Sequence, residues 1–225
     1  MNATPRPRST RDRPAKPPLS QDAVVDAALA LLRSEGLDAV TMRRVAAALD
    51  TGAASLYVYV SGREGLLQAV QDRIFGLIEF EEPDQARWRE QLHALLDRTY
   101  RVLVAHPGIA ATTMSEPPGM DATLRLLENM LGLLLAGGLV AQDAAWAVDI
   151  FALLVSYAAM EHEARRTNPR EQPEELYQRF TGQSPERFPL ITAYAAQLVA
   201  GDSEERFHVA IDMVVDGMIA RAGRA

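Results

Sequence analysis

The chain has 225 residues, enough for one or two domains, and its 48% hydrophobic and 6% aromatic content is typical of a soluble protein with an aliphatic core. The sequence has no cysteine, which excludes disulfides, thiolate metal sites and a cysteine nucleophile, and its four histidines are scattered, so we expect no metal and no cofactor. The net charge of −7 is unevenly placed, because residues 1–65 hold nine Arg and Lys against seven Asp and Glu, whereas the remainder holds 14 against 23. Only the N-terminal end therefore favours a phosphate partner.

The first 18 residues are rich in Pro and Arg and hold too few large apolar groups to offset chain entropy, which predicts a flexible basic arm. This arm is either a solvated tail or a segment that lies along DNA phosphates or in a minor groove. No apolar segment follows its basic residues, as one would in a secretory signal, and no apolar run approaches the roughly 18 residues of a membrane span. We therefore expect a cytoplasmic protein.

Three short helices are predicted within residues 19–65. The first lies between the N-cap Ser20 and Gly36, and the second begins at Thr41 and ends near Leu49. After a short turn, a brief third helix covers residues 53–59. A helix, a tight turn and a second helix form the geometry by which proteins lay one helix in the major groove of DNA.

The third helix is the candidate recognition helix. It starts with the small residues Gly52, Ala53, Ala54 and Ser55, so its backbone can come close to base edges and to the thymine methyl group. Tyr57 and Tyr59 follow, about 200 degrees apart around a helix, so both cannot point the same way. Either one tyrosine reaches DNA and the other is structural, or both pack beneath the module.

The remaining chain is also predicted to be helical, since no strand pattern competes with the helical periodicity. We expect residues 167–186 to form a mobile connection, with one helical turn at residues 174–180. The fold class is therefore all-α. The predicted helices cover residues 63–78, 88–105, a short stretch after Pro107, 121–136, 142–166, 188–199 and 203–222.

Residues 19–70 read LSQDAVVDAALALLRSEGLDAVTMRRVAAALDTGAASLYVYVSGREGLLQAV. This stretch resembles the DNA-binding domain of tetracycline-repressor-type regulators, the TetR family, with Gly36, Thr41, Ala46, the triplet 55–57 and Arg63 in register. The resemblance implies a three-helix helix-turn-helix domain (residues 19–65) followed by a helical effector-binding and dimerisation domain (residues 66–225).

By position, the resemblance also implies DNA contacts at the starts of the second and third helices, with Arg63 on a phosphate. Asp50 and Thr51 depart from the family, which often has Gly and an aliphatic residue there, and Tyr59 replaces a frequent His. The DNA contacts expected are Thr41, Met42, Arg43, Ala53, Ala54, Ser55, Tyr57, Tyr59 and Arg63.

Two C-terminal helices have apolar surfaces that need covering. Residues 142–166 are apolar on every face, and Ala152, Ser156 and Ala159 are small enough for close approach. A second stripe runs through residues 207–218. One solution is an intermolecular four-helix bundle, which the resemblance also implies, and the other is an ordinary intrachain core. We favour a homodimer, because helix-turn-helix proteins read two half-sites about 34 to 36 Å apart through their own two-fold axis.

Soft and polar residues in the helices between residues 88 and 166 either belong to the core or line an effector cavity. By ungapped alignment, Thr113 replaces a histidine that binds drug-chelated magnesium in tetracycline-binding members of the family, and Leu95 and Thr99 replace two drug contacts. The resemblance thus implies an apolar, metal-free effector rather than tetracycline. The candidate effector-binding residues are Leu95, Thr99, Thr113, Met114, Met130, Trp146, Phe151 and Tyr157.

These features favour a repressor that binds a palindromic operator as a homodimer and is released by a small molecule. One alternative is a ligand-independent DNA-binding protein whose C-terminal domain only dimerises. An enzyme is the other, but the sequence has no Gly-rich phosphate loop, no nucleophile elbow and no clustered His, Asp and Glu.

Overall fold

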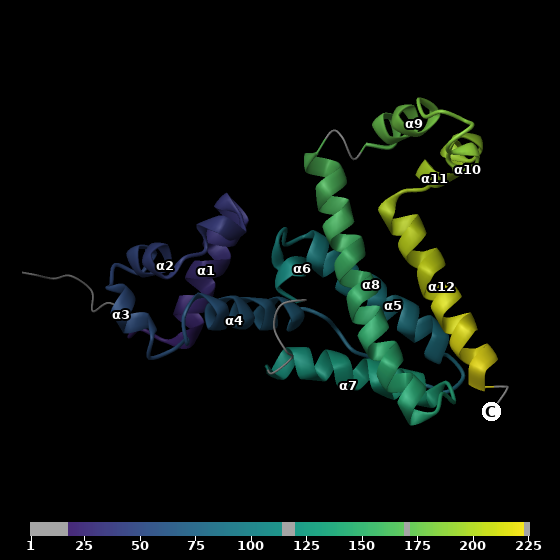
Figure 1. Ribbon diagram of the computed structural model, residues 1–225. Coiled ribbons are helices and arrows are strands. Elements are labelled where there is room, and N and C mark those ends of the chain that lie inside the picture. The colour runs from purple at the N-terminus through teal and green to yellow at the C-terminus, as the bar shows by residue number, and fades with distance from the viewer. Residues whose placement is uncertain (1–17, 114–119, 169–171, 223–225) are drawn as a thin grey trace, which may run out of the picture.

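The computed structural model describes residues 18–113, 120–168 and 172–222, and within these ranges every regular element is a helix (Figure 1). The predicted all-α fold is therefore confirmed. The chain forms a small N-terminal module and a larger helical bundle, and α4 (Arg63–Phe75) connects the two. It packs against α1 of the module and against α5, α6 and α7 of the bundle. Most of the predicted N-terminal arm, residues 1–17, lies outside the described residues.

The N-terminal module contains α1 (Gln21–Glu35), a 3₁₀ turn η1 (Leu37–Ala39), α2 (Met42–Ala48) and α3 (Ala53–Leu56). The predicted N-cap Ser20 and the predicted helix start at Thr41 are both confirmed. The Ser20 hydroxyl accepts a hydrogen bond from the Ala23 amide at 3.1 Å, and the Thr41 hydroxyl accepts one from the Arg44 amide at 3.3 Å. The third helix is shorter than predicted, since it ends at Leu56, and η1 was not predicted.

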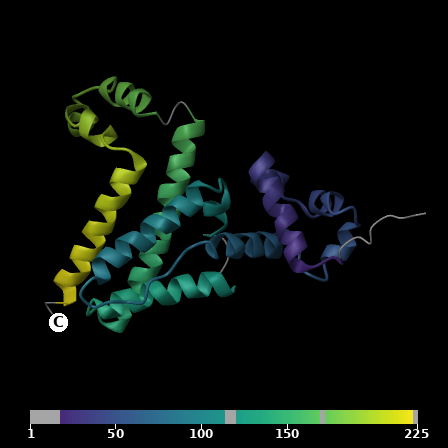
Figure 2. The same ribbon diagram turned by 180° about the vertical axis from the view of Figure 1, so that it is seen from behind.

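The C-terminal bundle has α8 at its centre, packed against α5, α6, α7 and α12 (Figure 2). The predicted bounds of α7 and α12 are confirmed, and those of α5 and α8 are confirmed to within one residue. The bounds are α5 (Trp88–Val104), α6 (Ile109–Thr112), α7 (Asp121–Ala136), α8 (Ala141–Thr167) and α12 (Ser203–Ala222).

Between α8 and α12 the chain forms three short helices, α9 (Pro173–Thr181), α10 (Pro189–Ala193) and α11 (Ala195–Val199), which lie at one end of the bundle (Figures 1 and 2). The expected single turn in the connection is thus a nine-residue helix. The helix predicted over residues 188–199 is divided at Tyr194, where α10 ends and α11 begins.

α8 is, among the described residues, the one helix long and apolar enough to cross a membrane by length and composition. No apolar run long enough for a membrane span was predicted from the sequence. Four helices of the same chain cover α8, and the Phe151 side chain at its middle is fully buried. A helix packed in this way is typical of a bundle, although one face of α8, with 39% of its apolar window buried, remains open.

The small residues of α8 were predicted to face a second subunit, and this prediction is wrong. Ser156 and Ala159 are buried within the bundle, and Ala152 lines an internal cavity. The apolar stripe of α12 also faces its own chain, with Phe207 and Ile211 almost fully buried. The intrachain core that the sequence left as an alternative therefore takes up these small residues of α8 and this stripe of α12, while other apolar side chains of both helices remain exposed.

Charged side chains repeat every four residues along α5 and face a matching set on α12. Arg89 forms ion pairs with Asp212 at 2.8 Å and with Asp216 at 2.7 Å, and His93 Nε2 lies 3.1 Å from Asp212. The hydrogen bond from Arg89 holds the pKa of the Asp212 carboxyl below its ordinary value of 3.8.

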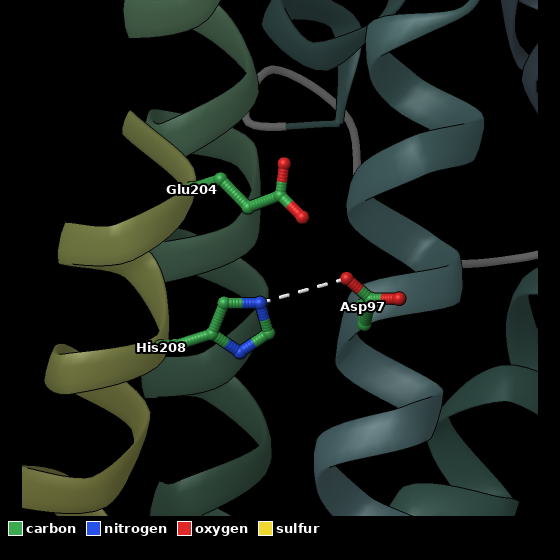
Figure 3. Close-up of side chains that lie close together, drawn as sticks. All are labelled: Asp97, Glu204 and His208. Carbon is green, nitrogen blue, oxygen red and sulfur yellow. Dashed lines mark ion pairs between the residues drawn. The ribbon is translucent and has the colours of Figure 1, made fainter. Parts of the chain in front are cut away.

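The same row continues with Asp97, Glu204 and His208 (Figure 3). His208 Nε2 lies 3.6 Å from an Asp97 carboxylate oxygen. Arg101 extends between the carboxylates, at 2.8 Å from Asp97 and 3.3 Å from Glu204. Two carboxylates and an imidazole could hold a metal ion, but the Arg101 guanidinium already supplies the positive charge between them. We therefore describe this row as an ion-pair clasp between α5 and α12.

We expect Asp212→Asn to lower the free energy of unfolding at pH 7 by about 0.5 kcal/mol, as is typical of exposed ion pairs. Because the folded pKa of Asp212 is depressed, its stabilisation is present above pH 3.8 and is lost as the pH falls below that value. Urea unfolding followed by circular dichroism at pH 7 and pH 3 measures the difference, with Glu90→Gln as the control. A difference of equal size at both pH values would contradict the prediction.

Candidate DNA-binding surface and effector cavity

The outer surface of α3 is formed by small side chains and one large aromatic. Ala54 and Ser55 are exposed, and Tyr57 and Val58, which follow the helix, are 60% and 80% exposed. Leu56 points the other way and is fully buried, which fixes the helix on the module. Because most side chains on this edge of α3 are small, its backbone can approach DNA bases closely.

The start of α2 lies beside this edge. Arg43 is exposed, whereas Thr41 and Met42 are half-buried. The Thr41 hydroxyl caps the helix, and Met42 packs against the core. The neighbouring Arg44 is paired with Glu35, and this hydrogen bond raises the pKa of its guanidinium. Arg43 is therefore the cation of α2 that remains available to a phosphate or a base.

The turn between α2 and α3 requires a left-handed residue, and Asp50 has a φ of 52°. Most residues are strained in this left-handed region, but Gly, Asn and Asp adopt it readily. This explains why Gly is frequent at this position in the TetR family. The Thr51 amide then donates to the Ala46 carbonyl at 2.9 Å and closes the turn. The departure at Asp50 therefore keeps the helix-turn-helix backbone.

Tyr59 has a structural contact. Its hydroxyl donates to the Leu19 carbonyl oxygen at 2.7 Å, 40 residues away in the sequence, and its ring is partly buried against the core. The Tyr57 hydroxyl forms no hydrogen bond with the described residues, and its side chain is exposed to solvent. The structure therefore separates the two tyrosines, and Tyr57 is the one whose side chain is displayed on the α3 surface.

Arg63, at the start of α4, is hydrogen-bonded inside the module. Its Nε donates to the Val40 carbonyl at 3.0 Å, and a terminal nitrogen donates to the Leu37 carbonyl at 3.4 Å. These bonds hold α4 against η1 and the start of α2. The expected phosphate contact would use the remaining guanidinium N–H groups, since arginine has five.

A cavity of about 240 Å³ lies inside the bundle between α4, α5, α7 and α8. Three of the eight predicted effector residues, Thr99, Thr113 and Met130, line it. The Thr113 and Ser156 hydroxyls are hydrogen-bonded to each other at 2.7 Å, which joins α8 to the end of α6. The other residues in the wall are Gln71, Phe75, Leu103, Thr123, Leu126, Leu127, Ala145, Val148, Asp149, Ala152, Val155 and Ser156.

The remaining predicted effector residues lie elsewhere. Leu95 and Phe151 are fully buried in the core and are not part of the cavity wall. Trp146 and Tyr157 are 55% and 64% exposed, on a different face of α8 from the cavity. Met114 lies outside the described residues.

Sequence reasoning missed Gln71 and Phe75, which reach the cavity from the C-terminal end of α4. It also missed Asp149, a polar residue within an apolar helix. Ala145, Asp149 and Ala152 recur at helical spacing, so this row of small and polar side chains on α8 was the available signal.

α4 is attached to the cavity walls by side-chain hydrogen bonds. The Thr112 hydroxyl on α6 donates to Gln71 Oε1 at 3.0 Å, and the Asp72 carboxylate accepts from the Thr123 amide of α7, also at 3.0 Å. Gly108, just before α6, has a φ of 87° and approaches the module so closely that a Cβ there would lie 2.8 Å from Leu37. The bundle thus contacts the DNA-binding module at Gly108 and Leu37 as well as through α4.

Comparison with known families identifies both parts of the chain. Residues 24–70 match bacterial regulatory proteins of the tetR family, and residues 82–222 match the tetracyclin repressor-like C-terminal domain. The chain belongs to the TetR family. The resemblance that the sequence suggested is therefore confirmed, and the helix-turn-helix is that of a transcriptional regulator.

Solved TetR-family structures share this fold along most of the chain. Apo ActR from Streptomyces coelicolor superposes with a TM-score of 0.84 at 32% identity, covering 92% of this chain and 99% of ActR. ActR in complex with actinorhodin gives the same TM-score and identity, over 92% of this chain and 98% of ActR.

Named relatives match over a shorter stretch. An HTH-type transcriptional regulator of Saccharopolyspora erythraea is 33% identical over 123 residues, which is 55% of this chain and 52% of the relative. The HTH-type transcriptional repressor DrrR1 of Streptomyces coeruleorubidus is 37% identical over 123 residues, 51% of this chain and 46% of the repressor. The alignments thus span about half the length of these relatives.

We expect Tyr59→Phe to lower the free energy of unfolding by about 1 kcal/mol, because it removes one partly buried hydrogen bond and little apolar surface. Tyr57→Phe, whose hydroxyl is exposed, is the matched control and should change stability by less than about 0.5 kcal/mol. Urea unfolding followed by circular dichroism measures both. Equal stability of the two variants would argue against the Tyr59 to Leu19 hydrogen bond.

Proposed function

We propose that the protein is a ligand-responsive transcriptional repressor of the cytoplasm that binds a palindromic operator as a homodimer and is released by a small molecule. It acts by binding and conformational change and not as an enzyme. The names of its relatives support regulation of transcription, and one of them is named a repressor. ActR, with the same fold, has been solved with a bound small molecule.

The main support for this proposal is that α4 extends from the DNA-binding module to the cavity. At its first residue, Arg63 is hydrogen-bonded to the DNA-binding module, and near its end Gln71 and Phe75 line the cavity. A ligand that displaces either side chain therefore shifts the helix that supports α1 to α3. Release from DNA then corresponds to the ligand's preference for the shifted conformation. A C-terminal domain that only dimerised would need no such cavity.

The cavity wall is mostly apolar, which supports an effector with an apolar body. DNA binding is assigned to the edge formed by α3 and the start of α2. Tyr57 and Arg43 are the exposed long side chains there, with Tyr59 and Arg63 acting chiefly in support. The full set that we propose remains Thr41, Met42, Arg43, Ala53, Ala54, Ser55, Tyr57, Tyr59 and Arg63.

We expect Tyr57→Ala and Arg43→Ala each to weaken specific operator binding at least tenfold, since a good base contact contributes about 1 to 3 kcal/mol. The operator is first obtained by selecting tight-binding sequences from a random DNA pool with the wild-type protein. Gel shifts with that sequence give the affinities, and circular dichroism shows that the variants are folded.

Arg125→Ala is the control, because Arg125 lies on α7 and is paired with Asp121. Binding should also weaken steeply as salt is added, because phosphate contacts release counterions. Wild-type affinity in both α2 and α3 variants would refute this assignment of the DNA-binding surface.

An exposed apolar seam supports the dimer. On α8 it consists of Trp146, Ile150, Leu153, Tyr157 and Met160, whose spacing alternates between four and three residues, and all are at least 37% exposed. This is the spacing of helices that pack against each other in bundles.

The outer face of the adjacent α12 adds Val209 and Met213, and the exposed Gly217 and Ala220 permit close approach. The small residues needed for a tight interface are thus on α12 rather than at the predicted positions on α8. We propose that two copies pair through these α8 and α12 faces.

We expect the wild-type protein to be a dimer at micromolar concentration by light scattering, with twice the chain mass of 24.7 kDa. Leu153→Glu should yield a monomer, because it places a charge at the centre of the seam. Leu135→Glu, at an exposed site on α7, should remain dimeric. A dimeric Leu153→Glu variant would show that the interface lies elsewhere.

A further inference from the structure

The effector cavity continues into a groove at the protein surface. A hollow of about 460 Å³ lies between α7 and α8, lined by Leu124, Leu127, Glu128, Leu131, Ala145 and Val148. Leu127, Ala145 and Val148 also line the effector cavity, so the two spaces adjoin at these side chains. A ligand can therefore place one end in the cavity and the other in the groove.

The ionisable groups along this path all have the same sign. Asp149 is the ionisable residue among the described residues that line the cavity, and Glu128 is its counterpart in the groove. No Lys, Arg or His is found in either set of described lining residues. Both carboxylates are exposed, which places them where the two spaces open to solvent.

These carboxylates are not neutralised by the protein. Neither carboxylate, Asp149 nor Glu128, has a side-chain hydrogen bond or ion pair within the described part of the chain. The arginines nearest in the sequence of α7 and α8 are engaged, since Arg125 pairs with Asp121 and Arg165 pairs with Glu161. Asp149 thus faces the cavity as an unpaired negative charge.

The hydroxyl groups of the wall already have partners. The Thr99 hydroxyl donates to the Leu95 carbonyl at 2.8 Å, and the Thr113 and Ser156 hydroxyls bond to each other. The Thr123 hydroxyl donates to the Asp72 carboxylate at 3.3 Å. Gln71 accepts from Thr112 through its Oε1, so its amide N–H groups are left to donate to a ligand. Among the described wall residues, Asp149 is therefore the group that suits a cation.

We propose that the effector is a cationic amphiphile, an apolar ring or chain that carries a protonated amine, with the amine paired to Asp149 at the mouth of the cavity. The proposal rests on the repressor function proposed above and adds the charge of its ligand. A carboxylate beside apolar walls attracts a cation more strongly than it would in open solvent, and it repels an anion of the same shape. Glu128 adds a weaker attraction from the groove.

The test uses two fluorescent probes that differ in one charged group. Dansylcadaverine carries a primary ammonium group at the end of a pentyl chain, and dansyl pentylamide has the same ring and chain without it. We expect the wild-type protein to bind the ammonium probe about tenfold more tightly, as one charge-assisted hydrogen bond allows. Titration at low ionic strength, followed by dansyl fluorescence, gives both dissociation constants.

Asp149→Asn should reduce this preference to less than about twofold and leave the neutral probe unaffected, because it removes the charge and keeps the shape. Glu128→Gln should reduce it less. Glu90→Gln, which removes an exposed carboxylate outside both spaces, is the control for net charge and should keep the tenfold preference. Ala152→Trp and the smaller Ala152→Leu narrow the cavity and should weaken both probes.

The outcomes separate this inference from the function on which it rests. Equal affinity of the wild type for the two probes, or an undiminished preference in Asp149→Asn, overturns the cationic effector. If the Ala152 variants then still weaken binding, the effector cavity stands. Failure of both probes to bind saturably, or binding that neither Ala152 variant weakens, removes the cavity and with it the ligand-responsive repressor.

Discussion

The structure depends on one helix that belongs to both parts of the molecule. α4 is hydrogen-bonded to the DNA-binding module through Arg63 and to the bundle through Gln71 and Asp72. A helix of thirteen residues cannot bend freely, since each turn is closed by backbone hydrogen bonds. Close-packed interiors also respond to a ligand by shifting whole elements. In the proposed mechanism, a movement of the cavity wall at α7 or at the end of α6 is carried through α4 to α1, α2 and α3.

The N-terminal module could be predicted almost fully because its signals are local. Ser20, Thr41 and Gly36 each mark a helix end within a few residues of their own position, and the structure confirms all three. The end of α3 and the position of Tyr59 could not be predicted in this way. The Tyr59 hydroxyl bonds to Leu19, and no periodicity or propensity within the third helix reveals a contact 40 residues away.

The candidate effector site was predicted less completely, because α8 is apolar on nearly every side and its sequence does not show which side faces the cavity. The aromatic residues Trp146 and Tyr157 were interpreted as cavity residues and lie on the outer seam, while the small Ala152 and Ser156 lie inside. Large side chains fit the seam because a second subunit can cover them. Small side chains leave the space in which a ligand can lie. The packing of the neighbouring helices thus determines which side of α8 faces the cavity, and the sequence of α8 alone does not show it.

The uneven charge of the chain links the two proposed binding events. The chain beyond position 65 holds 23 acidic against 14 basic residues. Many of its arginines form ion pairs, such as Arg89 with Asp212 in the ion-pair clasp. The remaining acidic groups repel the DNA backbone, which agrees with the proposed DNA contact at the α2 and α3 edge. The same excess favours a cation at the mouth of the cavity. On these two proposals, one distribution of charge directs an anionic polymer to one end of α4 and a cationic small molecule to the other.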